Sequence, residues 1–296
     1  MYEKLLSCPL CDGIEYHNEI ICKDHSVTHE QFVIVRCSSC NLLFTNPRPE
    51  PSQLPKYYES DEYISHTSKA NSIINLVYKL ARYFTLRNKE QLVSKYIGPT
   101  KAKSILDYGC GTGHFLEHCK TKGWNIRGIE PNEQAREQAN KHTSNHVVSG
   151  LIELDSKNKF DAITLWHVLE HVPNLNETIA KLIGLLKTKG VLIIAVPNPN
   201  SWDAKHYKEY WAAYDVPRHL YHFTSDVIQN LAKKHQLKLK HKLPMKLDSF
   251  YVSMLSEKYK NGSNNFIESI ISGIKSNRFA RNHKDEYSSL IYVLKK

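Results

Sequence analysis

Short apolar segments alternate with polar segments of helical character between residues 104 and 196, and no other sequence feature constrains the fold as strongly. The apolar segments have the length and composition of strands, and they are residues 104–107, 125–129, 160–165 and 191–196. Between them, residues 132–141 and 175–187 have the clearest helical pattern. Strands interleaved with helices form βαβ crossovers, which give a parallel sheet covered by helices on both faces. The sequence therefore predicts an α/β fold.

The sequence outside this region adds elements to the same pattern. Apolar residues recur at helical spacing from Ser72 to Ile97, where we expect one or two helices. Further along the chain we expect a helix at 224–235 and strands at 237–243 and 289–294. The 296 residues are 41% hydrophobic and 24% charged, which is typical of globular proteins. That composition excludes a disordered chain, a collagen and a coiled coil.

A glycine-rich loop follows the first strand of the alternating region. The segment Ile105-Leu-Asp-Tyr-Gly-Cys-Gly-Thr-Gly-His-Phe115 runs from a strand through three glycines into a helix. Glycines at such a turn let the backbone bend tightly and approach a nucleotide. A dinucleotide fingerprint would have its third glycine at position 114, where this chain has histidine. The loop therefore predicts a nucleotide-like ligand other than a dinucleotide.

Two carboxylates beside the loop indicate what the ligand carries. Asp107 lies two residues before Gly109, where it would repel a pyrophosphate but attract an ammonium group. Glu130 lies at the end of the next strand, where it can accept hydrogen bonds from both ribose hydroxyls. A ligand with an amino-acid end, a ribose and no phosphate fits S-adenosylmethionine.

These residues give the sequence a resemblance to the class I S-adenosylmethionine-dependent methyltransferases. The resemblance rests on four motifs in the usual order, ILDYGCGTGHF, GIEP, FDAITLWHVLEHV and LLKTKGVLIIAVPN, and it covers about residues 100–243. It implies a Rossmann-like seven-stranded methyltransferase sheet. The implied cofactor-binding residues are Asp107, Gly109, Cys110, Gly111, Glu130, Leu151 and Trp166. In that scheme Asp107 and the loop hold the methionine end, Glu130 the ribose, and Leu151 borders the adenine.

Cysteine spacing predicts a metal site near the N-terminus. The chain has seven cysteines and no apolar signal core at its start, which favours metal binding over disulfides. Two pairs have a two-residue spacing, and the predicted ligands are Cys8, Cys11, Cys37 and Cys40. Four thiolates fill a tetrahedron, so we expect a structural Zn²⁺. Four free cysteines and an iron-sulfur cluster remain alternatives, and Cys22, His25 or His29 could replace a ligand.

We expect three parts along the chain. Residues 1–45 would form a zinc-binding module, in which a polar loop precedes a strand at Gln31–Arg36. Residues 46–100 would form a linker and lid helices, and 101–296 the methyltransferase domain with an insertion at about 244–285. The four-cysteine unit and the segment Asp215–Thr224 resemble the zinc-containing branch that includes sugar C-methyltransferases. The latter segment also resembles ubiquinone-biosynthesis-like relatives.

Three histidines are candidates for the general base that a methyl acceptor needs. The predicted catalytic residues are His171, His219 and His222, because a neutral imidazole can remove a proton near pH 7. His171 could instead have a structural role. Arg218 and Tyr221 are predicted to bind the substrate, with Arg218 contacting a carboxylate or phosphate. An internal salt bridge is the alternative for Arg218.

The charge distribution bears on partners. The net charge is +10, yet residues 231–296 alone contain 14 Lys and Arg against 5 Asp and Glu. Within that region, apolar residues at helical spacing beside basic ones at 266–281 could contact an anionic surface, or could pack on their own domain. The longest apolar run, 191–196, is far shorter than the ~20 residues of a membrane helix. We therefore expect no integral membrane segment and a cytoplasmic protein.

The expected function is methylation of an anionic small molecule, such as a nucleotide sugar, a glycan or glycolipid precursor, or a quinone-like metabolite. An RNA methyltransferase is the alternative enzyme. Nucleic acid is not the expected partner, because residues 1–45 contain 3 Lys and Arg against 6 Asp and Glu. A non-catalytic adaptor that retains the fold is a second alternative, against which Asp107, the glycine loop and Glu130 argue.

Overall fold

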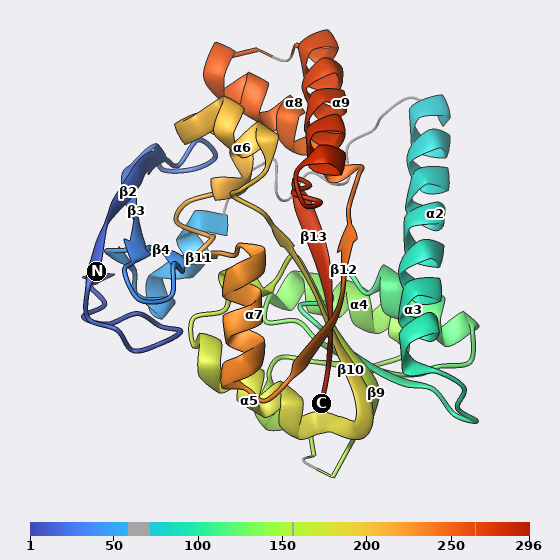
Figure 1. Ribbon diagram of the computed structural model, residues 1–296. Coiled ribbons are helices and arrows are strands. Elements are labelled where there is room, and N and C mark those ends of the chain that lie inside the picture. The colour runs from blue at the N-terminus through green and yellow to red at the C-terminus, as the bar shows by residue number, and fades with distance from the viewer. Residues whose placement is uncertain (59–71, 156, 264) are drawn as a thin grey trace.

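A computed structural model describes residues 1–58, 72–155, 157–263 and 265–296, with side chains of 72–83 also outside the description. Part of the expected linker, residues 59–71, therefore lies outside the described residues. The main body is a seven-stranded sheet with helices on both faces (Figure 1). This confirms the predicted α/β, Rossmann-like fold.

Six strands of the main sheet are parallel and one is antiparallel. The strands are β6 (Ser104–Tyr108), β7 (Asn125–Ile129), β8 (Val147–Val148), β9 (Phe160–Trp166), β10 (Leu186–Pro197), β12 (Lys238–Pro244) and β13 (Ser289–Lys295). Their order is β12-β13-β10-β9-β6-β7-β8, and β13 runs antiparallel to both neighbours. The parallel strands end at one edge of the sheet, where ligands of open α/β folds bind.

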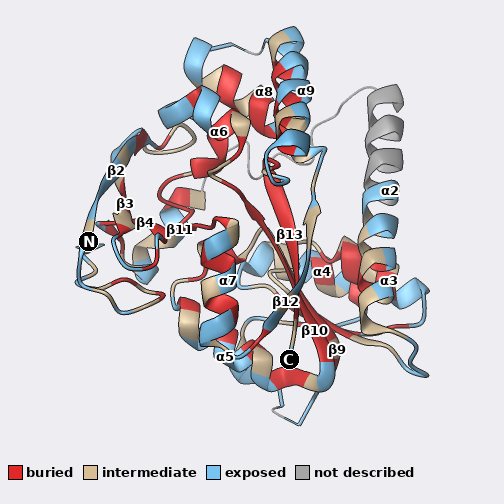
Figure 2. Ribbon diagram, in the orientation of Figure 1, coloured by how far each residue is buried: buried red, intermediate tan, exposed pale blue. Residues whose placement is uncertain are grey.

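Helices cover each face of this sheet. One face carries α2 (Ser72–Ile97), α3 (His114–Thr121) and α4 (Glu133–Thr143), and the other carries α5 (Leu175–Leu185) and α7 (Ser225–Lys234) (Figure 1). The two faces have separate cores. On β10, Ile194 joins the core with α5 and α7, whereas its neighbour Ile193 joins the core with α3 and α4. This period of two explains why β10 is apolar along its buried half (Figure 2).

A helical hairpin is inserted between the last two strands of the main sheet. It consists of α8 (Asp248–Asn261) and α9 (Phe266–Asn282), and it packs beside the short helix α6 (Trp202–Tyr207). These helices stand beyond the carboxyl ends of the parallel strands (Figure 1). Short 3-10 helices complete the chain, namely η1 (Pro51–Tyr58), η2 (Leu151–Glu153), η3 (Leu169–His171), η4 (Lys208–Tyr210) and η5 (Ala212–Tyr214).

The N-terminal region forms a second sheet. Its strands are β2 (Tyr16–Lys23), β3 (Gln31–Cys37), β4 (Leu43–Thr45) and β11 (Tyr221–His222), in the order β11-β4-β3-β2. A two-stranded pair of β1 (Tyr2–Glu3) and β5 (Arg48–Pro49) lies beside it. Part of the polar segment that was expected to be a loop before Gln31 is thus a strand, β2. It lies at the sheet edge with mostly exposed side chains, so its sequence lacks the apolar alternation of a buried strand.

The second sheet is completed by a strand from far along the chain. Tyr221 pairs with Phe44, and Leu10 and Cys37 share one buried core with Ile179 and Leu220. The N-terminal unit is therefore packed onto the main domain. In the described part of the chain, no helix has the length and hydrophobicity needed to cross a bilayer.

Candidate cofactor and metal sites

The glycine loop joins β6 to α3 at the carboxyl edge of the main sheet. Gly111 has a φ of +54°, and no atom lies within 4 Å of where its Cβ would be. Gly113 has a φ of +81°, and its Cβ would lie 2.9 Å from Ala139 of α4. Gly113 is thus required for helix packing, while Gly111 leaves the loop backbone open to a ligand. Cys110, which directly precedes Gly111, is half-buried.

Two carboxylates, Asp107 and Glu130, flank this loop. Asp107, only 3% exposed, accepts a hydrogen bond from Thr164 Oγ1 at 2.6 Å. Burial raises the pKa of Asp107 to about 7. Glu130 accepts from the Gly111 N–H at 2.8 Å and from the Asn132 N–H at 3.0 Å. An ammonium group would stabilise the charged form of Asp107, and Glu130 is held against the loop, so both fit an amino-acid-bearing nucleoside.

A lysine reaches this edge from α2, an element with no recognised motif. Lys89 of α2 lies 4.4 Å from the ring centre of Trp166, and burial lowers its pKa although Asp107 and Asp248 oppose this. Trp166 packs edge-on against Phe115, and its buried Nε1 has no hydrogen-bond partner among the described residues. Lys89 was missed because its helix carries only an amphipathic pattern. Leu151 is half-buried at the start of η2.

The segment after β9 carries an ionic bridge to the helical hairpin. His167 Nε2 lies 3.0 Å from Asp248 of α8, and its Nδ1 lies 3.5 Å from Glu170. Burial disfavours its charge, yet these two carboxylates raise the pKa of His167 to about 10. The Glu170 carboxylate is 1% exposed, and its oxygens have no hydrogen-bond partner among the described residues. The imidazolium of His167 thus ties the β9 loop to α8.

The three predicted catalytic histidines lie in a row. The ring centres of His171 and His219 are 4.6 Å apart, and those of His219 and His222 are 6.3 Å apart. His219 and His222 are buried, whereas His171 is half-buried. Burial and the neighbouring His219 lower the pKa of His171 to about 4, so its imidazole is neutral near pH 7. Of the three, His171 is the most accessible.

The tautomer of His171 follows from its contacts. Its Nδ1 lies 3.0 Å from the backbone carbonyl of Arg218 and 3.1 Å from the Tyr58 hydroxyl. A carbonyl can only accept, so Nδ1 carries the proton. Nε2 is then the ring atom with the free lone pair, which is the state that a general base requires.

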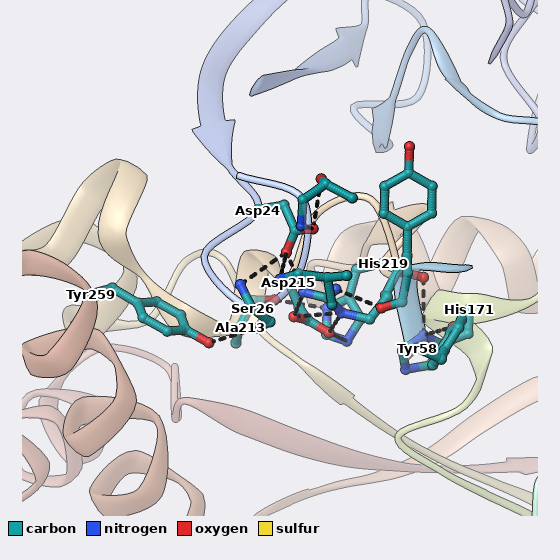
Figure 3. A network of polar contacts seen from close by, with 12 residues as sticks. Asp24, Ser26, Tyr58, His171, Ala213, Asp215, His219 and Tyr259 are labelled. Carbon is teal, nitrogen blue, oxygen red and sulfur yellow. Dashed lines mark hydrogen bonds and ion pairs between the residues drawn. The ribbon is translucent and has the colours of Figure 1, made fainter. Parts of the chain in front are cut away.

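Arg218 is buried and belongs to a polar network between the two sheets, of which Figure 3 labels Asp24, Asp215 and His219. Its Nη2 pairs with Asp215 at 2.7 Å and with Asp24 at 3.0 Å, and Nη1 donates to the Tyr57 carbonyl. Burial opposes these charges, but the pKa of both carboxyls lies below its usual range, for Asp24 because of the Thr28 N–H and the guanidinium, and for Asp215 because of the guanidinium. The geometry is that of the internal salt bridge, and it leaves the substrate-binding role of Arg218 without support.

Tyr221, the other predicted substrate residue, is fully buried. Its hydroxyl donates to the Pro173 carbonyl at 2.8 Å and accepts from Arg48 at 3.0 Å. Both groups belong to the chain itself, so Tyr221 joins the N-terminal sheet to the main domain. Asp24 and Arg48, which hold this junction, were missed because their partners are distant in the sequence.

The four cysteines of the predicted metal site come together. All four Sγ atoms lie within 4.8 Å of one another, with Cys8 to Cys40 at 3.5 Å and Cys11 to Cys37 at 3.6 Å. A tetrahedron with ~2.3 Å zinc–sulfur bonds has edges of about 3.8 Å. Each cysteine pair is followed directly by a residue with positive φ, which is Asp12 after the first pair and Asn41 after the second. The two Cys-x-x-Cys segments therefore form the same turn. The donor set and spacing fit one zinc ion.

In the part of the chain that the structure describes, two other clusters bring histidine and carboxylate ligand atoms within 4.8 Å of one another. One is Glu170, His171 and His219 beside the β9 loop, and the other is His114, Glu117 and His142 on α3 and α4. The latter side chains are 33–44% exposed, as surface ion pairs commonly are.

Comparisons with known proteins agree with this geometry. The sequence profile of a family described as "Methyltransferase domain" matches residues 79–242. A ubiquinone biosynthesis O-methyltransferase of Rickettsia felis is 30% identical over 115 residues, covering 37% of this chain and 47% of the relative. One of Glaesserella parasuis is 35% identical over 108 residues, covering 32% and 46%. The chain thus spans about half the length of the curated relatives it matches.

Solved structures have the same fold. The plantazolicin methyltransferase BpumL, in complex with a pentazolic desmethylPZN analog and SAH, has a TM-score of 0.51 at 20% identity. That likeness covers 83% of this chain and 92% of the other. The mycolic acid cyclopropane synthase CmaA1, complexed with SAH and CTAB, has a TM-score of 0.50 at 15% identity, covering 71% and 83%.

Proposed function

The chain belongs to the methyltransferase domain family, and from that premise we propose that it methylates a small molecule with S-adenosylmethionine. The observation that carries the proposal is the pair of carboxylates at the open glycine loop. Asp107 is buried and costly to ionise alone, and Glu130 is fixed against Gly111. An ammonium group and a ribose satisfy these two sites as no phosphate-bearing ligand would.

The chain's own groups would hold the cofactor as follows. Asp107 accepts from its ammonium group, the backbone of Gly109, Cys110 and Gly111 lines its methionine end, and Glu130 accepts from the ribose hydroxyls. Leu151 borders the adenine, and Trp166 covers the sulfonium side. When bound, S-adenosylmethionine supplies an electrophilic methyl group. What remains for the protein is to position the acceptor and to remove its proton.

His171 is the proposed general base. Its pKa of about 4 keeps it neutral at pH 7, and its Nδ1–H donates to the Arg218 carbonyl, which leaves Nε2 to accept a proton. Arg218 then has a positioning role, because its salt bridges fix the backbone that orients His171. His219 and His222 are more deeply buried, so of the three imidazoles His171 is the one that an acceptor can reach.

The proposed acceptor is a hydroxyl group on a quinone-like small molecule. The supporting observation is the likeness of about a third of this chain to proteins named ubiquinone biosynthesis O-methyltransferases. Nucleotide sugars and glycan precursors are the competing acceptors, as the zinc-containing resemblance suggests. A panel of catechols and nucleotide sugars, assayed for transfer of labelled methyl groups, decides between them.

The test of the mechanism compares His171→Gln with His222→Gln. His171→Gln should lower kcat by roughly 10²–10⁴ while leaving the Kd of S-adenosylhomocysteine unchanged, because a base acts only in the chemical step. His222→Gln, at a buried position, is the matched control and should keep its turnover. The activity that depends on His171 should be constant above about pH 5, since the base is deprotonated there. If both variants kept the turnover of the wild type, His171 would not be the general base.

We also propose one structural zinc ion held by the four cysteines. Because all four positions of a tetrahedral ion are then filled by protein, the zinc would stabilise the N-terminal sheet and take no part in methyl transfer.

A further inference from the structure

Helix α9 presents its large apolar side chains to solvent and its small ones to the protein. The outward residues are Phe266, Ile267, Ile270, Ile271 and Ile274, which are 62%, 73%, 54%, 38% and 54% exposed. The buried residues of the same helix are Ser269, Ser272, Gly273, Ser276 and Ala280. A helix that only packed on its own domain would have the opposite arrangement. The interpretation that this stripe packs on its own domain is therefore wrong.

Close contacts on the small-residue face fix this orientation. A Cβ on Gly273 would lie 2.5 Å from the Phe250 ring of α8, so no larger residue fits there. Ser249 donates to the Gly273 carbonyl at 3.2 Å, and Ser276 donates to the buried Asp203 at 2.6 Å. Because these contacts need small side chains, α9 cannot rotate to bury its isoleucines. The apolar face is a fixed surface of the hairpin.

The fully exposed charges of the hairpin all have one sign, while Glu268 in the first turn of α9 is half-buried. In the described part of residues 248–282, the exposed charged side chains are Lys260, Lys275, Arg278 and Arg281. Arg278 and Arg281 follow Ile274 by four and seven residues, which places them on the same side of the helix. An apolar stripe that continues into basic residues matches the boundary between acyl chains and anionic headgroups.

The position of the hairpin relates this face to the candidate site. The hairpin stands beyond the carboxyl ends of the parallel strands, and the exposed residues of α9 lie at that end of the molecule (Figures 1 and 2). Asp248, at the start of α8, contacts His167 at 3.0 Å. A surface bound by α9 would therefore lie at the same end of the protein as the glycine loop.

We propose that the outer face of α9 docks on an anionic lipid bilayer. A second copy of the chain fits this face less well, because a two-fold interface would bring four exposed cations close to their own copies. Anionic headgroups instead neutralise these cations while the isoleucines enter the acyl boundary. The proposal does not rest on the proposed methyl transfer, and it is tested by binding alone.

The experiment measures co-sedimentation of the full-length protein with large unilamellar vesicles. Phosphatidylcholine vesicles containing phosphatidylglycerol should bind the protein at least ~10-fold more strongly than phosphatidylcholine alone, and added salt should weaken that binding. Ile270→Ser with Ile274→Ser should lower binding by ~10-fold or more, because both side chains leave the acyl boundary. Arg278→Gln with Arg281→Gln should remove the preference for anionic vesicles.

The matched control is Ile14→Ser with Ile21→Ser, which removes two isoleucines that are 78% and 54% exposed on the N-terminal unit. It should bind vesicles as the wild type does, and unchanged circular dichroism should show that all variants fold. Equal binding by the α9 variant and the control would overturn the proposal, as would absence of vesicle binding in the wild type. So would a concentration-dependent dimer, in analytical ultracentrifugation, that only Ile270→Ser with Ile274→Ser dissociates.

Discussion

Asp107 has a proposed role in cofactor binding, and its buried carboxylate lowers the stability of the protein when no cofactor is bound. Its pKa of about 7 lies well above the ordinary value of 3.8, because burial disfavours the carboxylate. The folded state therefore holds the proton more tightly than the unfolded state does. Asp107 contributes stability below about pH 4, and that contribution is lost as the pH rises through 7. A cofactor ammonium group would reverse the preference by favouring the carboxylate.

This balance predicts opposite effects of Asp107→Asn on stability and on binding. At pH 8 the variant should have a higher Tm without ligand, since no buried charge remains, but should bind S-adenosylhomocysteine at least ~10-fold more weakly. For the wild type, calorimetric affinity should rise up to about pH 7 and then level off. Asp226→Asn, an exposed carboxylate on α7, is the control. Identical pH profiles for wild type and Asp107→Asn would refute this role.

Arg218 is expected to act through stability rather than by contacting substrate. Arg218→Ala would leave the buried Asp24 and the half-buried Asp215 without their cation, and removing one partner of a buried ion pair such as Arg218–Asp24 costs about 3–5 kcal/mol. Urea unfolding should show this loss. Arg218→Lys keeps the positive charge, but an ammonium group cannot donate to several partners in one plane as the guanidinium does. We therefore expect an intermediate loss of unfolding free energy. A large rise in KM with unchanged unfolding free energy would instead restore the substrate role.

Secondary structure elements with their own periodicity could be predicted from the sequence. Strands β6, β7 and β9 agree with the expected segments within one residue, because each is buried on both faces. β10 begins at Leu186 rather than Val191, since its first residues are polar and extend past the sheet core. β8 and β11 have two residues each, too few for any pattern to develop. Their pairing depends on tertiary contacts.

The packing of α3 on α4 yields a prediction at the scale of elements. Gly113→Ala places a Cβ 2.9 Å from Ala139 in addition to forcing a φ of +81°. Gly123→Ala has the same backbone problem, with a φ of +80°, but nothing lies within 4 Å of its Cβ. Both should lose about 1–2 kcal/mol from backbone strain. Gly113→Ala should lose a further ~1–3 kcal/mol from overpacking, measured as the difference in urea unfolding. Equal losses would mean that α4 moves aside freely.

At the scale of the whole molecule, some residues of the candidate site are close together in the sequence, and others are brought together only by the tertiary fold. Asp107, the glycine loop and Glu130 lie in one continuous stretch of 24 residues. Their place at the site could therefore be predicted from the local sequence. Lys89 comes from α2 and Asp248 from α8, and neither helix carries a motif that reveals its place. Asp24 and Arg218 are 194 residues apart in the sequence. Such pairs are set by how the two sheets pack, which no local pattern encodes.

The junction between the sheets determines how far the effect of zinc removal should spread. Chelation should release one zinc per chain and unfold the Cys-x-x-Cys segments of Cys8 and Cys37. Because β11 pairs with β4, and Arg218 pairs with Asp24, backbone protection should also fall at 215–224.

Hydrogen exchange with and without chelator, read by mass spectrometry, tests this spread. Strands β6, β9 and β10 should keep their protection, since their cores are formed with helices of the main domain. Cys37→Ser should reproduce the pattern without chelator, while Cys22→Ser, a buried cysteine outside the cluster, should retain its zinc. If the loss of protection stops at residue 45, the N-terminal unit folds on its own. In that case the shared strand and the buried arginine join two units without making their stabilities depend on each other.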